Sequence, residues 1–221
     1  MFYEATKRAI DIFGALVFLT LLAPVFFVIA LAIRLDSRGP VLYIHERVTV
    51  KGQLFRILKF RSMKLEYSTG AQYGGKEAEV YLKLILNDPV NKEEFKKFYK
   101  LKNDPRVTRV GRILRKMSLD EIPQFWNVLV GSMSLVGPRA YLPNELLTQM
   151  DVYPQIKSNV KKLLQAKPGI TGPWQISGRS SINFDARVRM DAEYAVQRSL
   201  RYDLYILMHT PMAVLTARGA V

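Results

Sequence analysis

Hydrophobic residues are concentrated near the start of the chain, where residues 12–33 form a run without a single charge. As a helix these 22 residues would reach roughly 33 Å, enough for a bilayer core of roughly 30 Å. The run is too long for a cleaved signal peptide, and no small-residue cleavage site follows it. This pattern predicts a membrane segment.

Pro24, preceded by Ala23, lies near the middle of this run. A proline there removes a backbone hydrogen bond and clashes with the preceding turn, so we expect a broken helix. Basic residues flank the run on both sides, and the positive-inside rule therefore gives no preferred direction. We predict a re-entrant helix that enters and leaves by the cytoplasmic face. An ordinary transmembrane helix with a tolerated proline is the alternative, and the residues alone leave it open.

Shorter patterns follow the membrane segment. Residues 41–50 and 54–60 are β-branched and aromatic on either side of Lys51-Gly52, which predicts a β-hairpin. Residues 168–174 are rich in glycine and proline and are expected to be irregular. Apolar residues at helical spacing predict further helices in residues 76–86, 92–101, 107–130 with a break at 122–123, 143–164, 184–194 and 200–215.

These elements predict an α+β fold that is mainly α-helical. Residues 1–36 are expected to form the N-terminal re-entrant membrane helix, and residues 37–221 a compact cytoplasmic, membrane-associated catalytic domain with a small β-hairpin. The lysine-rich residues 64–103 are expected to be an insertion or lid. Amphipathic helices are expected at the membrane interface, and the apolar residues 200–215 are expected to form a helix that either packs on the core or lies at that interface.

The composition limits the chemical classes of partner that the chain is expected to bind. Lysine and arginine number 33 against 19 acids, a net charge of +14 that predicts an anionic partner such as nucleic acid, anionic lipid or a phosphorylated substrate. The chain has no cysteine and two histidines, which argues against disulfides and against cysteine- or histidine-rich metal sites. No P-loop or Rossmann glycine pattern occurs.

Asp120 and Glu121 are adjacent acids that follow a cationic segment, residues 109–116, in which arginine and lysine are frequent. Ser118 stands three residues before Glu121, so a capping box at a helix start is the ordinary explanation. Pro123 argues against it, because a proline suits the first helical position and would leave both acids just before the helix. The alternative is a functional pair of carboxylates within an excess of positive charge.

Five clustered basic residues are candidates for binding phosphate: Lys59, Arg61, Arg112, Arg115 and Arg139. The ordinary explanation is a solvated basic face, or one that rests on anionic lipid. Arginine suits the alternative, because its planar fork matches phosphate oxygens. Arg139 is the strongest candidate, since Gly137-Pro138 fixes the backbone before it.

An ordered series of motifs runs nearly end to end, in residues 7–11, 36–41, 55–63, 114–124 (with SLDEIPQ at 118–124), 133–139 (ending in GPR), 167–172 and 175–179. With these motifs the chain resembles the bacterial sugar transferase family, the monotopic polyprenyl-phosphate phosphoglycosyl transferases. The length of residues 64–103 resembles the catalytic domain of larger hexose-1-phosphate transferases. Ala23 departs from the serine that the family often has before its helix-breaking proline.

The resemblance implies transfer of a sugar-1-phosphate from a UDP-sugar to undecaprenyl phosphate, with release of UMP. It would be the first membrane step of exopolysaccharide, capsule or O-antigen assembly. In similar proteins the first acid of the pair is the nucleophile, here Asp120, which would form a covalent glycosyl-phospho-aspartate intermediate. Glu121 would position Asp120 or the metal, and Mg²⁺ would sit at these two carboxylates.

The resemblance also assigns binding roles and a location. Lys59, Arg115 and Arg139 would hold substrate phosphates, and Pro138 and Arg179 are the candidates for the nucleotide site. The expected partners are UDP-sugar, undecaprenyl phosphate, the lipid bilayer and a second copy in a homodimer, with no nucleic acid. The expected location is the bacterial inner membrane, with the catalytic domain on its cytoplasmic face.

The alternative function is a membrane-tethered basic protein that binds nucleic acid or anionic lipid without enzymatic activity. The sequence carries no helix-turn-helix or RNA-binding motif, and nucleic-acid binding would leave the apolar helix unexplained.

Overall fold

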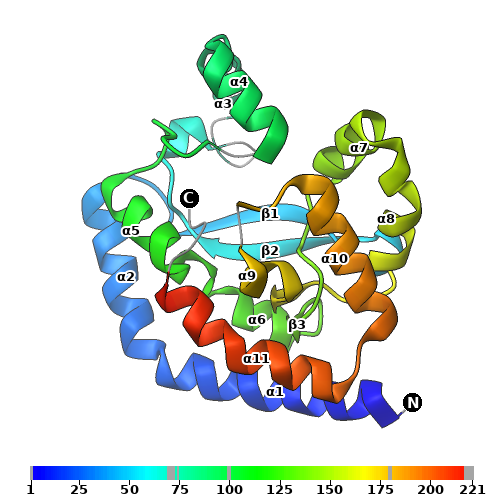
Figure 1. The fold of residues 1–221 in the computed structure, drawn as a ribbon. Coiled ribbons are helices and arrows are strands. Elements are labelled where there is room, and N and C mark those ends of the chain that lie inside the picture. Colours follow the sequence, from blue (N-terminus) through cyan, green and yellow to red (C-terminus); the bar gives the residue numbers. More distant parts are fainter. Residues whose placement is uncertain (1, 69–72, 74, 99–100, 179–180, 217–221) are drawn as a thin grey trace.

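The structure, a computed structural model, describes residues 2–68, 73, 75–98, 101–178 and 181–216. These residues are mainly helical and form two small sheets, as expected for the predicted fold class (Figure 1). The helices are α1 Phe2–Leu21, α2 Ala23–Asp36, α3 Gly75–Ile85, α4 Pro89–Phe98, α5 Arg109–Met117, α6 Gln124–Leu129, α7 Pro143–Val152, α8 Lys157–Leu163, α9 Pro173–Ser177, α10 Phe184–Gln197 and α11 Leu200–Leu215. The strands are β1 Leu42–Val48, β2 Leu54–Phe60, β3 Ser134–Val136 and β4 Gly169–Thr171, and the 3₁₀ turns are Val50–Gly52, Leu65–Tyr67, Leu119–Glu121 and Pro154–Ile156.

Helices α1 and α2 meet at a bend of 60°. Leu22 lies at the bend, and Ala23 and Pro24 open α2, where a missing proline N–H leaves no helical bond unmade. The predicted helix break is therefore present at these residues. Within the described residues no single helix is both long and apolar enough to cross a bilayer, but the bent pair meets that requirement together.

The predicted β-hairpin is confirmed, since β1 and β2 pair in antiparallel fashion from Leu42 opposite Phe60 to Val48 opposite Leu54. Gly52 has a φ of 78° in the turn, a conformation that glycine adopts without strain.

The irregular structure predicted for residues 168–174 is wrong. Strand β4 pairs in parallel with β3, and α9 begins at Pro173. The glycines there serve close backbone approach rather than turns: a side chain on Gly169 would meet the backbone of Gly137, and one on Gly137 would meet that of Lys167.

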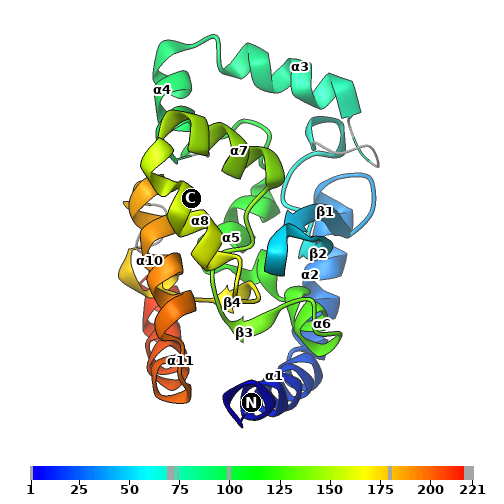
Figure 2. The ribbon, with the colours of Figure 1, turned by 90° about the vertical axis from the view of Figure 1, so that its right-hand side faces the viewer.

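Helices α1 and α11 lie along one end of the molecule, and α3 and α4 stand at the opposite end (Figures 1 and 2). Asp203 of α11 joins the two long helices, because its carboxylate accepts hydrogen bonds from Lys7 Nζ at 2.8 Å and Tyr3 Oη at 3.0 Å. Asp11 of α1 is buried and accepts from Ser134 Oγ at 3.0 Å and the Leu135 N–H at 2.9 Å. The apolar helix is thus tied to β3 by buried polar contacts.

Replacing Asp11 by alanine is expected to lower the free energy of unfolding by about 1–3 kcal/mol, because the buried donors of Ser134 and Leu135 lose their acceptor. Asp11→Asn is the matched control, since its amide oxygen can still accept both bonds. Chemical unfolding in detergent measures both variants. Equal stability of Asp11→Ala and the parent would contradict this role.

Candidate functional site

The two acids lie in a 3₁₀ turn between α5 and α6. Ser118 closes α5 in the left-handed conformation, with a φ of 57°, so the capping box expected at Ser118 is wrong. Helix α6 begins at Gln124, directly after Pro123, so the acids lie just before that helix, as the proline predicted. The break in the predicted helix 107–130 also comes earlier than expected, at Ser118.

Lys59 of β2 brings the two carboxylates to one point. Its Nζ lies 2.6 Å from Glu121 Oε1 and 3.8 Å from Asp120 Oδ2. Asp120 is 9% exposed, so its carboxylate is largely shielded from water, while Glu121 is only partly buried. In such a position the charges interact more strongly than they would on an open surface.

Arg115 approaches the same acids from the last turn of α5. Its Nε donates to Ser62 Oγ at 2.9 Å, which ties the guanidinium to the end of β2. Burial lowers the pKa of Arg115, and the negative charge of Asp120 is the largest opposing influence. The structure therefore brings Lys59, Arg115, Asp120 and Glu121 together.

Asn127 fixes the distance between β2 and α6, the elements on either side of the acids. Its Oδ1 accepts from the Leu58 N–H at 2.9 Å, and its Nδ2 donates to the Arg56 carbonyl at 2.7 Å. Because Lys59 follows Leu58 on β2, this clamp holds the lysine opposite the 3₁₀ turn.

Arg139 lies in the loop after β3, with its backbone N–H bonded to Asp191 Oδ2 at 3.0 Å. The carbonyl of Pro138 accepts from the Gly169 N–H at 2.8 Å and so fixes this loop.

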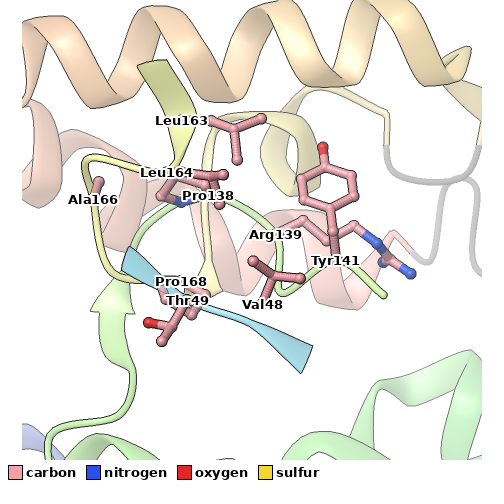
Figure 3. Close-up of a pocket in the computed structure, with 9 residues that line it drawn as sticks. All are labelled: Val48, Thr49, Pro138, Arg139, Tyr141, Leu163, Leu164, Ala166 and Pro168. Atoms are coloured by element: carbon pink, nitrogen blue, oxygen red, sulfur yellow. The ribbon is translucent and has the colours of Figure 1, made fainter. Parts of the chain in front are cut away.

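In Figure 3 the Arg139 side chain extends away from Leu163 and the other aliphatic residues of a small cavity. That cavity of about 10 Å³ has room for about one water at most, so it is a packing void rather than a substrate site.

Arg47 of β1 interacts electrostatically both with the carboxylate site at Glu121 and with the loop that carries Arg139. Burial, together with the charge of Arg139, lowers its pKa to about 10, while the charges of Glu145 and Glu121 act in the opposite direction. Arg47 thus lies within electrostatic reach of both Glu121 and Arg139. Sequence reasoning missed it, although a charged residue within a strand-like pattern is a signal.

Asp191 of α10 was also missed, because the interleaved acids and bases of this helix resemble a solvated face. It is fully buried and accepts a hydrogen bond from Tyr141 Oη at 2.8 Å besides that from Arg139. Burial raises the pKa of Asp191 to about 7.

Stability is expected to fall as the pH rises from about 4 to about 7. In this window the folded protein holds a proton on Asp191, whose pKa is raised from 3.8 to about 7, while the unfolded chain has released it. Asp191→Asn should remove this part of the pH dependence. Thermal unfolding of both proteins at pH 4.5 and 7.5 measures it, and equal slopes would contradict the assignment.

Two carboxylates converge on one cation at Lys59, so the dyad offers two of the hard oxygen ligands that Mg²⁺ prefers. The described residues contain no group of three or more metal-ligating side chains. Mg²⁺ typically takes one or two carboxylates and completes its shell with substrate phosphates and water. Asp120 and Glu121 therefore fit an ion that a diphosphate completes. The remaining nucleotide-site candidate, Arg179, lies outside the described residues.

A bent apolar helix pair and a carboxylate pair set among cations are thus joined in one fold. The chain belongs to the bacterial sugar transferase family, whose model matches residues 2–217. It is 42% identical over 214 residues to the undecaprenyl-phosphate galactose phosphotransferase of Salmonella typhimurium, covering 97% of this chain and 41% of that protein. It is 39% identical over 214 residues to the exopolysaccharide production protein ExoY of Rhizobium meliloti, covering 97% and 87%.

A third relative is the UDP-glucose:undecaprenyl-phosphate glucose-1-phosphate transferase of Escherichia coli, 37% identical over 209 residues, which cover 92% of this chain and 39% of that protein. The chain therefore spans about two fifths of the length of the Salmonella and Escherichia relatives, and most of ExoY.

Proposed function

We propose that this chain transfers a sugar-1-phosphate from a UDP-sugar to undecaprenyl phosphate and releases UMP. The relatives' names supply the two substrates. The observation that carries the proposal is the position of Lys59 between Asp120 and Glu121, with Arg115 within electrostatic reach of Asp120. A carboxylate can attack a phosphorus atom only where cations neutralise the phosphate, and this site supplies them.

In the first step a carboxylate oxygen of Asp120 attacks the sugar-bearing phosphorus. A bond forms between that oxygen and the phosphorus, and the bond from the phosphorus to the bridging oxygen of the diphosphate breaks. UMP leaves with the bridging oxygen and its electron pair. The sugar stays attached to its phosphate, which is now a mixed anhydride with Asp120.

In the second step a phosphate oxygen of undecaprenyl phosphate attacks the same phosphorus. The bond between the phosphorus and Asp120 breaks, and the carboxylate is regenerated. The product is the sugar diphosphate of the lipid. Two displacements at one phosphorus allow a single carboxylate to serve two substrates that need not be bound together.

Cationic groups position the two acids and neutralise the charge of the substrate phosphates. Lys59 holds the two acids in place and offers charge to the incoming phosphate, while Arg115 and Arg139 bind phosphate oxygens. Asp120 and Glu121 would hold Mg²⁺, which when bound neutralises diphosphate charge. Glu121 also fixes Lys59 through the 2.6 Å ion pair.

The bent helix pair places this chemistry at the bilayer in our proposal. Large apolar side chains on α1, α2 and α11 point outward, among them Phe13 at 72%, Phe27 at 71% and Met208 at 71% exposed. Buried in lipid they would stabilise a re-entrant anchor, and α11 would lie at the interface beside α1 (Figure 2). The catalytic domain would then face the cytoplasm at the inner membrane.

Cysteines introduced at Phe2 and at Arg38 are expected to react with a membrane-impermeant reagent from the same side of the membrane. Both positions are exposed, and the chain has no native cysteine to interfere. A cysteine at the exposed Lys83, in the predicted lid, marks the cytoplasmic side. Labelling of the first two positions from opposite sides would establish a spanning helix instead.

Release of UMP tests the function. Membranes containing the chain are incubated with Mg²⁺, undecaprenyl phosphate and each of several UDP-sugars, and UMP is measured. We expect release with a subset of the sugars and dependence on the lipid phosphate for repeated turnover. No release with any sugar, together with steeply salt-dependent binding of duplex DNA, would favour the non-enzymatic alternative.

A further inference from the structure

Three arginines from different elements form a group here called the arginine cluster. Arg139, after β3, and Arg187 of α10 lie over the Trp174 ring, and Arg47 of β1 donates to the carbonyl of Ala140, the residue after Arg139. The Cζ atoms of Arg139 and Arg187 lie 5.1 and 4.9 Å from the centre of the indole ring, which is 6% exposed. Arg139 is the centre of the cluster, because its charge lowers the pKa of both Arg47 and Arg187.

Arg61, which the sequence pattern offered as a phosphate-binding candidate, instead binds backbone carbonyls and so has a structural role. It is 2% exposed and donates to the carbonyls of Ser37, Arg38 and Pro40 at 2.8, 2.7 and 2.6 Å. Its whole fork is occupied by acceptors, and in this way it joins the end of β2 to the end of α2.

The arginines of the cluster have fewer hydrogen-bond acceptors around them than Arg61 has. Arg187 is 1% exposed and donates to one carbonyl, that of Ile182 at 3.2 Å, and Arg47 donates to that of Ala140 at 3.1 Å. In the described part of the chain, the Nε atoms of all three arginines and Nε1 of Trp174 are buried without a hydrogen-bond partner. None of the ion pairs between described residues includes a cluster arginine.

Two buried acids lie near the cluster, but their negative charge does not balance the positive charge of its three arginines. Glu145 Oε2 accepts from the Leu142 N–H at 3.3 Å, and Asp191 Oδ2 accepts from Tyr141 and from the Arg139 backbone. With a pKa of about 7, Asp191 carries only part of a negative charge at neutral pH. Positive charge is therefore in excess, and holding it away from water costs free energy that a bound anion would offset.

We propose that the arginine cluster is a phosphate-ester subsite, in which Arg47 and Arg139 contact the phosphate and Arg187 is a positioning residue. This inference rests on the proposed function and adds Arg47 and Arg187 to its phosphate ligands. Arg187 acts through the Trp174 indole and through its own charge, since it is 1% exposed. Arg47 makes the subsite continuous with the dyad, because it lies within electrostatic reach of Glu121.

The ligand chemistry has two sources, the diphosphate of the UDP-sugar and the phosphate of undecaprenyl phosphate. Calorimetric titration with UDP and with undecaprenyl phosphate separates them. Arg47→Gln and Arg187→Gln are each expected to raise the Kd of the same ligand by about tenfold or more. The first change removes a charged hydrogen bond to phosphate, and the second removes the buried charge that holds Trp174 in position. Arg187→Lys should recover part of the affinity, which a purely steric role would not predict.

Arg56→Gln is the matched control, because this arginine side chain is exposed on β2. A rise in the Kd of UDP assigns the subsite to the nucleotide, and a rise in that of undecaprenyl phosphate assigns it to the lipid. Affinities for both ligands within about twofold of the parent, in a folded Arg47→Gln protein, would overturn the proposal. UMP release could still be present in that case, and cluster-dependent UDP binding without UMP release would instead reject the proposed function alone.

A second measurement does not depend on changing a buried arginine. The chain has two tryptophans, so Trp126→Phe leaves Trp174 as the sole indole. A ligand at Arg139 should change Trp174 fluorescence, in a saturable manner, at the concentrations where calorimetry shows binding. Unchanged emission at saturation with both UDP and undecaprenyl phosphate would contradict the subsite.

Discussion

Asp120→Asn is expected to lower the rate of UMP release by on the order of 10⁴-fold or more, the typical cost of removing a covalent nucleophile. Asparagine has nearly the same shape but no anionic oxygen to form the bond to phosphorus. The Lys59 ion pair with Glu121, at 2.6 Å, does not involve the altered side chain, so we expect the site to keep its structure.

Two controls belong with this variant. Asp151→Asn makes the same chemical change at an exposed position of α7 and should turn over like the parent. Thermal unfolding of Asp120→Asn should match the parent within a few degrees. If folded Asp120→Asn released UMP at a rate near that of the parent, Asp120 would not be the nucleophile.

Lys59→Gln is expected to lower kcat by about 10²–10³-fold, the typical loss when one preorganised charge is removed from a transition state. The change leaves Asp120 and Glu121 without the ammonium that joins them at 3.8 and 2.6 Å. It also removes a positive charge that would face the incoming diphosphate. Steady-state UMP release over a range of UDP-sugar concentrations separates kcat from KM.

Lys59→Arg should restore part of the rate, because it keeps the charge but not the compact ammonium geometry. Lys83→Gln, at an exposed position of α3, is the matched control and should leave kcat unchanged. A folded Lys59→Gln protein with a kcat within about twofold of the parent would show that the lysine serves only the fold.

Local patterns predicted the elements that depend on neighbouring residues. The hairpin around Gly52, the break before Pro24 and the long helix that ends the described chain all follow from period, proline or glycine signals within a short window. The placement of both acids before α6 likewise followed from Pro123. The Ser118 capping box failed because the chain closes α5 there in a left-handed conformation.

Contacts between distant segments were not predictable in this way. Gly169 looked like a turn residue, but its role is to let β4 approach β3. Arg47 and Arg187 lie in patterns typical of a strand and of a solvated helix face, and only the fold brings them to Arg139. Lys59 and Glu121, by contrast, were both proposed for the site, yet their 2.6 Å ion pair depends on the Asn127 clamp between β2 and α6.

The central claim is that Asp120 forms a covalent bond to the sugar phosphate. Protein mixed with UDP-sugar and Mg²⁺, but without undecaprenyl phosphate, should gain the mass of one sugar-phosphate and release one equivalent of UMP. Peptide mapping should place the added mass on Asp120, and addition of undecaprenyl phosphate should remove it. UMP release that requires undecaprenyl phosphate from the first turnover, with no mass gained by the protein, would contradict the covalent route.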